Sequence, residues 1–242
     1  MVPVIRSSIT SARPNRQEST MQKFDTPAPI SAVLDIPAGS VQFIAADRAD
    51  TVVEILPTDA SKARDVKAVE QTTVEYADGV LRIHTSAKNQ YFGPSGSLEV
   101  TVHLPTDSRV EAKAASAKLR SAGRLGDITF DGAYSQIKID KAAAVNLTAV
   151  DGDVEVAHLN GPAQITTTRG DIKITEAVRG KVVLSTQSGA ISVGAAPGVS
   201  ATLDAGTSYG RITNTLKNAE GPTANLNIHA TTAHGNITAH SL

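Results

Sequence analysis

The stretch from Val145 to Val193 contains one phrase three times: VNLTAVDGDVEV at 145–156, AQITTTRGDIKI at 163–174 and VVLSTQSGAISV at 182–193. Each copy has an aliphatic residue, small residues on alternate positions, a glycine-centred turn and a short aliphatic alternation. Alternate side chains of a strand point to one face, so each copy predicts short β-strands with one apolar face. A unit of about twenty residues cannot bury such a face alone, whereas stacked units share a continuous core.

Glycine turns extend this pattern beyond the three copies. Glycine adopts positive φ without a Cβ penalty, and an aspartate after it can bond local backbone amides. The last five turns are 18, 19, 21 and 25 residues apart, and the first gap, of 26, holds an extra turn and strand at Ser135-Gln136-Ile137. The predicted turns are Gly126-Asp127, Gly152-Asp153, Gly170-Asp171, Gly189-Ala190, Gly210-Arg211 and Gly235-Asn236.

Stacking of the units puts like residues over like residues, in three ladders. The first contains Ile128, Val154, Ile172, Ile191, Ile212 and Ile237, the second Leu147, Ile165, Leu184 and Leu203, and the third Ala149, Thr167, Thr186 and Ala205. The period-2 alternation excludes a helical repeat. We therefore predict an all-β, single-domain β-solenoid, right-handed and β-helix-like, with two short strands per coil and repeats of about 18–25 residues.

The chain before these repeats is less regular. We expect residues 1–20 to be a disordered tail or an upstream extension ahead of a start at Met21, and residues 21–242 to form the solenoid domain. Within it, 21–105 is the less regular part and 106–242 holds the regular repeats. Asp78-Gly79 predicts a hairpin turn. Residues 59–71 suit a helix or a charged loop, and residues 110–121 favour strand over helix.

Composition excludes several classes of function. The net charge of -1 argues against general attraction to nucleic acid or an anionic membrane. The chain has no cysteine, which excludes disulfides and thiolate metal sites, and 3% aromatic residues, which suits a thin aliphatic core. No run approaches the ~18 apolar residues of a membrane span. The apolar run at 2–5 is too short for an export signal, so we expect a cytoplasmic location.

Several segments resemble a bacterial β-strand-repeat family of unknown function labelled "putative adhesin", in particular its actinobacterial members. They are MQKFDTPAPISAVLDIPAGSVQFIAADRADTVVEILPTD at 21–59, the segment 69–76, LDAGTSYGRITNTL at 203–216 and HATTAHGNITAH at 229–240. The resemblance covers about residues 21–242. It implies a right-handed β-solenoid-like fold and no established enzyme activity, and it offers no catalytic or binding residues to transfer. The adhesin label is a fold-level analogy.

No cluster of residues predicts catalysis or a cofactor. A ladder of Asp127, Asp153 and Asp171 could bind calcium, but the later turns carry other residues, so we favour bonds to turn amides. The six histidines fit no metal-site spacing, which favours surface roles for His84, His103, His158, His229, His234 and His240. The acids after residue 141 do not form an obvious catalytic set; they are Asp151, Asp153, Glu155, Asp171, Glu176, Asp204 and Glu220.

Two surface features remain as candidate contacts. Residues 109–141 hold seven basic and four acidic residues, a charge of +3 that favours a solvated face over an anion-binding one. The cations are Arg109, Lys113, Lys118, Arg120, Arg124, Lys138 and Lys141. Tyr91 and Phe92 form an exposed-looking pair that suits a plug for the end of the solenoid better than a partner contact.

The sequence thus predicts a non-enzymatic scaffold that binds an unknown protein or envelope partner and neither nucleic acid nor a cofactor or metal. The alternative is a carbohydrate-binding or carbohydrate-active solenoid, a lyase or hydrolase. A homo-oligomer formed through the solenoid ends is a further possibility. Binding residues are unknown, but the outward set should carry them: Thr148, Thr166, Ser185, Glu155 and Lys173.

Overall fold

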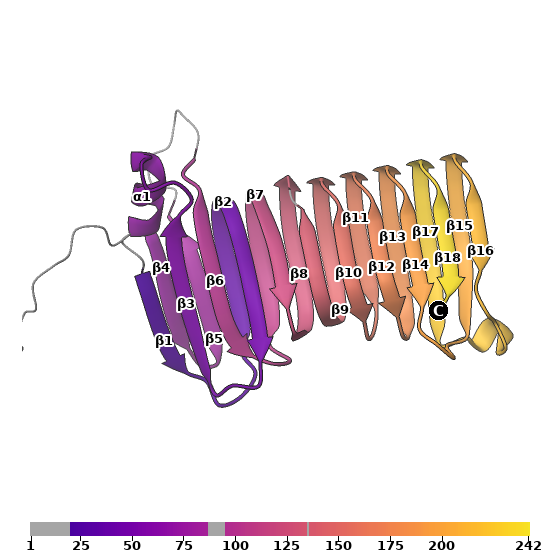
Figure 1. Ribbon diagram of the computed structural model, residues 1–242, viewed down its shortest axis with the longest axis horizontal. Coiled ribbons are helices and arrows are strands. Elements are labelled where there is room, and N and C mark those ends of the chain that lie inside the picture. The colour runs from indigo at the N-terminus through magenta and orange to yellow at the C-terminus, as the bar shows by residue number, and fades with distance from the viewer. Residues whose placement is uncertain (1–19, 87–94, 135) are drawn as a thin grey trace, which may run out of the picture.

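The structure, a computed structural model, describes residues 20–86, 95–134 and 136–242 (Figure 1). Strands dominate it, with one helix, α1 (Ala63–Glu70), and one 3-10 turn, η1 (Gly221–Thr223). The first nine strands are β1 (Thr20–Asp25), β2 (Ser31–Ala46), β3 (Asp50–Pro57), β4 (Thr72–Ala77), β5 (Val80–Thr85), β6 (Leu98–Pro105), β7 (Arg109–Ala122), β8 (Arg124–Tyr134) and β9 (Ile137–Asp151). The others are β10 (Val154–Leu159), β11 (Ala163–Arg169), β12 (Ile172–Ala177), β13 (Gly180–Ser188), β14 (Ile191–Ala195), β15 (Ala201–Tyr209), β16 (Ile212–Thr215), β17 (Leu226–His234) and β18 (Ile237–Ser241).

The strands form the two faces of a β-solenoid. Face A contains, in spatial order, β4, β5, the first half of β2, the first half of β7, β8, the second half of β9, β11, β13, β17 and β15. Face B contains β1, β3, β6, the second half of β2, the second half of β7, the first half of β9, β10, β12, β14, β18 and β16. The all-β solenoid with two strands per coil is therefore confirmed.

The core consists of stacked aliphatic side chains between the two faces. On face B, residues Ile137, Val154, Ile172, Ile191 and Ile237 lie in register, and none is more than 1% exposed. Because like lies over like, each coil buries its apolar side chains against the coils on both sides. Such a thin core needs few large rings.

The predicted turn at Gly126-Asp127 is wrong. Both residues lie inside β8, and the chain bends earlier, at Gly123, which has a φ of +82°. Ile128 consequently pairs with Val145 on face A rather than with Val154. Ile137, from the segment predicted to form an extra turn and strand, pairs with Val154 on face B in the position predicted for Ile128. Position 126 requires glycine, because a Cβ there would lie 2.6 Å from the Asp107 carbonyl oxygen of the preceding coil.

The coils do not all stack in the order of the chain. The C-terminal strands β17 and β18 lie between β13–β14 and the coil formed by β15 and β16 (Figure 1). Leu203 therefore pairs with Ile228 rather than following Leu184, and Ala205 pairs with Ala230. The coil of β15 and β16 is the last in space, and Ile212 is 43% exposed at a ladder position that is buried in the other coils.

The N-terminal end of the solenoid differs from the C-terminal one. Its outer strands are antiparallel: β4 on β5, and β1 on β3 on β6. Asp78 and Gly79, both with positive φ, form the predicted hairpin turn between β4 and β5. Of the segment 59–71, for which a helix or a loop was predicted, residues 63–70 form the helix α1, which contacts β3 and β6. Residues 110–121 form a strand, as predicted, within β7.

The proposed division of the chain at residues 20/21 and 105/106 stays a prediction. Residues 1–19, and with them most of the expected tail, lie outside the described residues. The same holds for Tyr91 and Phe92.

Candidate functional site

The aspartates of the turns bond backbone amides of the neighbouring coil. The Asp171 amide donates to Asp153 Oδ1 at 2.9 Å, and the Ala190 amide donates to Asp171 Oδ1 at 2.7 Å. Asn236 Oδ1 accepts in the same way from the Arg211 amide. Asp127 lies in β8, outside this series, so the three-carboxylate ladder considered for calcium does not form. These carboxylates act between coils rather than within their own turn.

The histidines lie on the surface and are dispersed. His84, His158 and His229 each contact a carboxylate, of Asp35 at 3.4 Å, Glu176 at 3.2 Å and Asp204 at 2.9 Å respectively. His234 stacks on Tyr209 with ring centroids 5.0 Å apart. Among the residues that the structure describes, no group of three or more His, Cys, Asp or Glu is placed to hold a metal ion.

Most acids after residue 141 already have a partner. Asp151 pairs with Arg169 at 2.8 Å, and Glu155 lies between Lys138 and Lys173 at 3.2 and 3.4 Å. The hydrogen bond from Lys138, followed by the one from Lys173, lowers the pKa of Glu155 from its ordinary value. A general acid of a glycosidase needs a raised pKa, so Glu155 is suited to holding two coils together rather than to proton donation.

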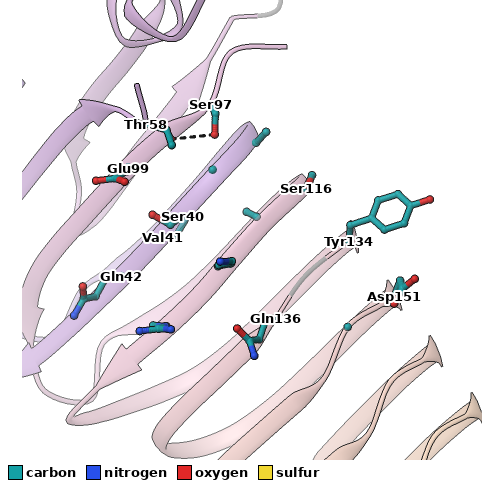
Figure 2. A pocket seen from close by; sticks show the side chains of 16 residues that line it. Ser40, Val41, Gln42, Thr58, Ser97, Glu99, Ser116, Tyr134, Gln136 and Asp151 are labelled. Carbon is teal, nitrogen blue, oxygen red and sulfur yellow. Dashed lines mark hydrogen bonds between the residues drawn. The ribbon is translucent and has the colours of Figure 1, made fainter. Parts of the chain in front are cut away.

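A hollow of about 830 Å³ lies on the outside of face B (Figure 2). Its floor crosses β6, β2 and β7 and reaches Gln136, the residue before β9, and we call it the face B groove. The alternation of each strand explains the floor: Val41 and Leu119 point into the core and are buried, so their neighbours point outward. The floor side chains are Glu99, Ser40, Gln42, Lys118, Arg120 and Gln136.

The rim of the groove follows one edge of face B, where the face B strands begin. Near β6, Thr58 Oγ1 donates to Ser97 Oγ at 3.0 Å (Figure 2). Farther along the same edge lie Tyr134 and Asp151, and Figure 2 shows the Tyr134 ring pointing away from the floor. Tyr134 is 58% exposed.

The floor of the groove gathers positive charge. Lys118 and Arg120 are on the same side of β7, and Arg120 lies directly opposite Lys138 of β9. Nearby cations are paired: Arg124 with Asp107, Lys138 with Glu155 and Arg169 with Asp151. Lys118 and Arg120 make no ion pair with any carboxylate in the described part of the chain.

The outward set expected from the sequence is divided between the two faces. Thr148, Thr166 and Ser185 lie side by side on face A, and Thr231 continues the row with a 3.2 Å hydrogen bond to Ser185. Glu155 and Lys173 are ion-paired on face B. Three hollows on face A have volumes of about 350, 520 and 550 Å³.

The groove was not predicted from the sequence. Lys118, Arg120 and Lys138 belong to the stretch 109–141, which has a charge of +3. In the structure, however, Lys113 of this stretch lies on face A, and Arg124 forms an ion pair with Asp107. The alternation within β7 could have shown that Lys118 and Arg120 share a side. Their neighbours Ser40 and Gln42 come from a strand 78 residues earlier, and no local signal indicates that pairing.

No helix within the described ranges has the length and apolar character needed to cross a membrane.

The comparisons with known proteins agree with this architecture. The family model described as Toastrack DUF4097 matches residues 33–241. A "putative adhesin" from Bacteroides fragilis NCTC 9343 has a similar structure, with a TM-score of 0.58, 14% identity, and coverage of 93% of this chain and 98% of the other. The resemblance noted in the sequence is confirmed, as is the fold. No enzymatic family is matched, and no curated protein matches the chain.

Two more distant structures were also found. A "putative cell adhesion protein" from Clostridium sporogenes ATCC 15579 has a TM-score of 0.39 and 11% identity, over 93% of this chain and 100% of the other. A "putative lipid binding protein" from Parabacteroides distasonis ATCC 8503 has a TM-score of 0.44 and 11% identity, over 91% of this chain and 96% of the other.

Proposed function

The chain belongs to the Toastrack DUF4097 family, and we propose that it is a non-enzymatic, adhesin-like scaffold that binds a partner in the face B groove. The observation that supports this is the groove itself. Its floor holds Ser40, Gln42, Lys118, Arg120 and Gln136, and none of these side chains has a hydrogen bond or ion pair within the described residues. Polar groups that do not serve the fold are available to a ligand.

The rest of the surface supports the same proposal by contrast. Six of the seven acids after residue 141 bind an amide, a cation or a histidine, and the glycine turns are occupied by contacts between coils. Catalysis of glycoside cleavage requires two carboxylates at a defined separation with separated pKa values. A binding role requires only a shaped polar surface on a rigid support, which a solenoid provides.

Photo-crosslinking tests the proposal. A photoreactive residue at Gln42 in the groove should form adducts with a component of the native cell extract, whereas one at Thr166 on face A should not. Ser40→Trp, which fills the groove, should abolish the Gln42 adducts, and Thr166→Trp should leave them intact. Equal adducts from both positions, or adducts that survive Ser40→Trp, would overturn the assignment of the groove.

A carbohydrate-binding or carbohydrate-active role is the second candidate, and the exposed Tyr134 ring on the rim favours it. A tyrosine ring is suited to contact a sugar, since its faces are apolar and the hydroxyl group at its edge is polar. Binding to a glycan array tests this role. Hydrolase or lyase turnover that survives purification and is lost in Asp204→Asn would show instead that the protein is an enzyme.

The cytoplasmic location and the oligomer formed through solenoid ends stay predictions. Fractionation with immunoblotting checks the first, and light scattering over a tenfold range of concentration checks the second.

A further inference from the structure

We infer that the face B groove binds an acidic polysaccharide, one whose sugar units carry carboxylate, sulfate or phosphate groups. This rests on the proposed function, that the groove is where binding takes place, and it adds the chemical class of the ligand. Two cations, Lys118 and Arg120, line the groove, and Lys138 lies beside it as the register partner of Arg120; we call the three the basic cluster.

The arrangement of the basic cluster costs folding energy. Arg120 and Lys138 are register partners on β7 and β9, and like charges directly opposite each other destabilise a sheet. Lys118 adds a third positive charge two residues along the same side of β7. Lys138 is partly neutralised by Glu155 at 3.2 Å, but the other two have no such carboxylate among the described residues. An anion bound over the groove would remove this repulsion.

The spacing within the cluster fits a polymer with regularly placed anions. Neighbouring strands are about 4.8 Å apart and residues i and i+2 of a strand about 6.6 Å apart, so the three charges lie within one or two sugar units of each other. The floor continues along the axis of the solenoid across β6, β2 and β7 as far as Gln136, which precedes β9. An extended chain can follow this direction.

The neutral groups of the floor distinguish a sugar from other anions. Gln42, Gln136, Ser40 and Ser116 offer hydrogen-bond donors and acceptors side by side, which suits hydroxyl groups. A peptide would need an apolar pocket for an anchoring side chain, and single-stranded nucleic acid would need aromatic rings on the floor for stacking. The one aromatic residue of the groove, Tyr134, is on the rim.

Glu99 places a negative charge at one end of the groove, opposite the basic cluster. It lies next to Ser40 on the side away from Lys118, and it is the one floor carboxylate. The other carboxylate of the groove, Asp151, is paired with Arg169. The anionic groups of the ligand should therefore lie toward β7 and β9, with hydroxyl groups toward β6. Removing the charge of Glu99 should strengthen binding.

The test measures binding of the purified full chain to polygalacturonate and to dextran sulfate, with neutral dextran, poly-glutamate and oligo(dT) as comparison probes. We expect binding to at least one acidic polysaccharide, which weakens as salt is added. Lys118→Gln/Arg120→Gln should weaken it by about tenfold or more, and Glu99→Gln should tighten it. Lys113→Gln/Lys181→Gln removes the same charge from face A and should leave binding unchanged. Circular dichroism verifies that each variant is folded.

Each other outcome overturns the inference in a recognisable way. Equal losses in the two double variants would show general charge attraction rather than a site. Equal or tighter binding of poly-glutamate or oligo(dT) would replace the sugar with a different class of polymer. If none of the acidic polysaccharides binds while crosslinks from Gln42 persist, the polysaccharide is wrong and the groove stands as a binding site. If both fail, the proposed function fails too.

Discussion

The backbone of Ile228 pairs with Val182 on one side and with Leu203 on the other, although in the sequence Leu203 lies between Val182 and Ile228. The C-terminal strands β17 and β18 therefore lie inside the stack, and the coil of β15 and β16 is at its end. Ile237 is 1% exposed and Ile212 is 43% exposed, although both occupy the same ladder position.

This order of coils predicts unequal losses of stability at Ile237 and Ile212. Ile237→Ala leaves a cavity between two coils and should cost about 2–5 kcal/mol. Ile212→Ala should cost clearly less, because its side chain is in contact with water on one side. Urea unfolding followed by circular dichroism measures both. If Ile212→Ala proved the more damaging, the coils would be stacked in chain order after all.

The glycine turns should not tolerate a side chain. At Gly170, with φ +128°, a Cβ would lie 2.2 Å from the Gly152 carbonyl oxygen of the neighbouring coil. Gly170→Ala should therefore combine backbone strain with overpacking and cost about 2–6 kcal/mol in thermal or urea unfolding.

Gly198 is the matched control for that substitution. It has φ +78°, but a Cβ there would meet nothing within 4 Å. Gly198→Ala should cost only the backbone strain, about 1–3 kcal/mol. Equal losses at the two glycines would mean that close approach between coils is not what requires glycine.

The aspartates of the turns should contribute unequally to stability. Asp171→Ala leaves the Ala190 amide without its 2.7 Å acceptor and should cost about 1 kcal/mol in the free energy of unfolding. Asp127→Ala should change this free energy by less than about 0.5 kcal/mol, because within the described part of the chain Asp127 makes only an exposed ion pair with Arg109 at 3.7 Å. We also expect calcium to leave the melting temperature unchanged; a rise that Asp171→Ala abolishes would indicate a calcium site.

Asp50 should make stability depend on pH in the acid range. The hydrogen bond from Arg48, followed by that from Lys23, lowers the pKa of Asp50 from 3.8 to about 2. A carboxyl group whose pKa is lower in the folded state stabilises the fold above pH 3.8, and this contribution is lost as the pH falls toward 2. The pKa of Asp59 is also lowered to about 2, chiefly by the hydrogen bond from the Ser61 hydroxyl, and this adds to the same dependence of stability on pH.

Asp50→Asn should flatten part of this acid slope in urea unfolding measured at several pH values. Asp47→Asn is the control, because Asp47 forms no ion pair in the described ranges. An unchanged slope in Asp50→Asn would show that the pairing with Arg48 and Lys23 does not stabilise the fold.

Local patterns predicted most of the architecture. The alternation in 145–156 and 163–174 predicts strand faces, and the glycine at Gly152 and Gly170 predicts where each coil turns. The same pattern gave a wrong turn at Gly126. A glycine followed by an aspartate is the same in sequence whether the glycine turns the chain or allows two coils to approach closely. The candidate groove could not be predicted, because Ser40 and Lys118 are brought together only by the pairing of β2 with β7.

The sequence by itself therefore determined the repeating unit: which side chains face the core, where the chain turns, and that such units must stack to bury one apolar face. Only the tertiary structure decided the order of the stack and the neighbours on its surface. The reason is physical. The aliphatic ladders are nearly alike from coil to coil, so local preferences leave the order of β15 and β17 undetermined. The order of β15 and β17 and, separately, the pairing of β2 with β7 that forms the face B groove both depend on contacts between residues far apart in the chain.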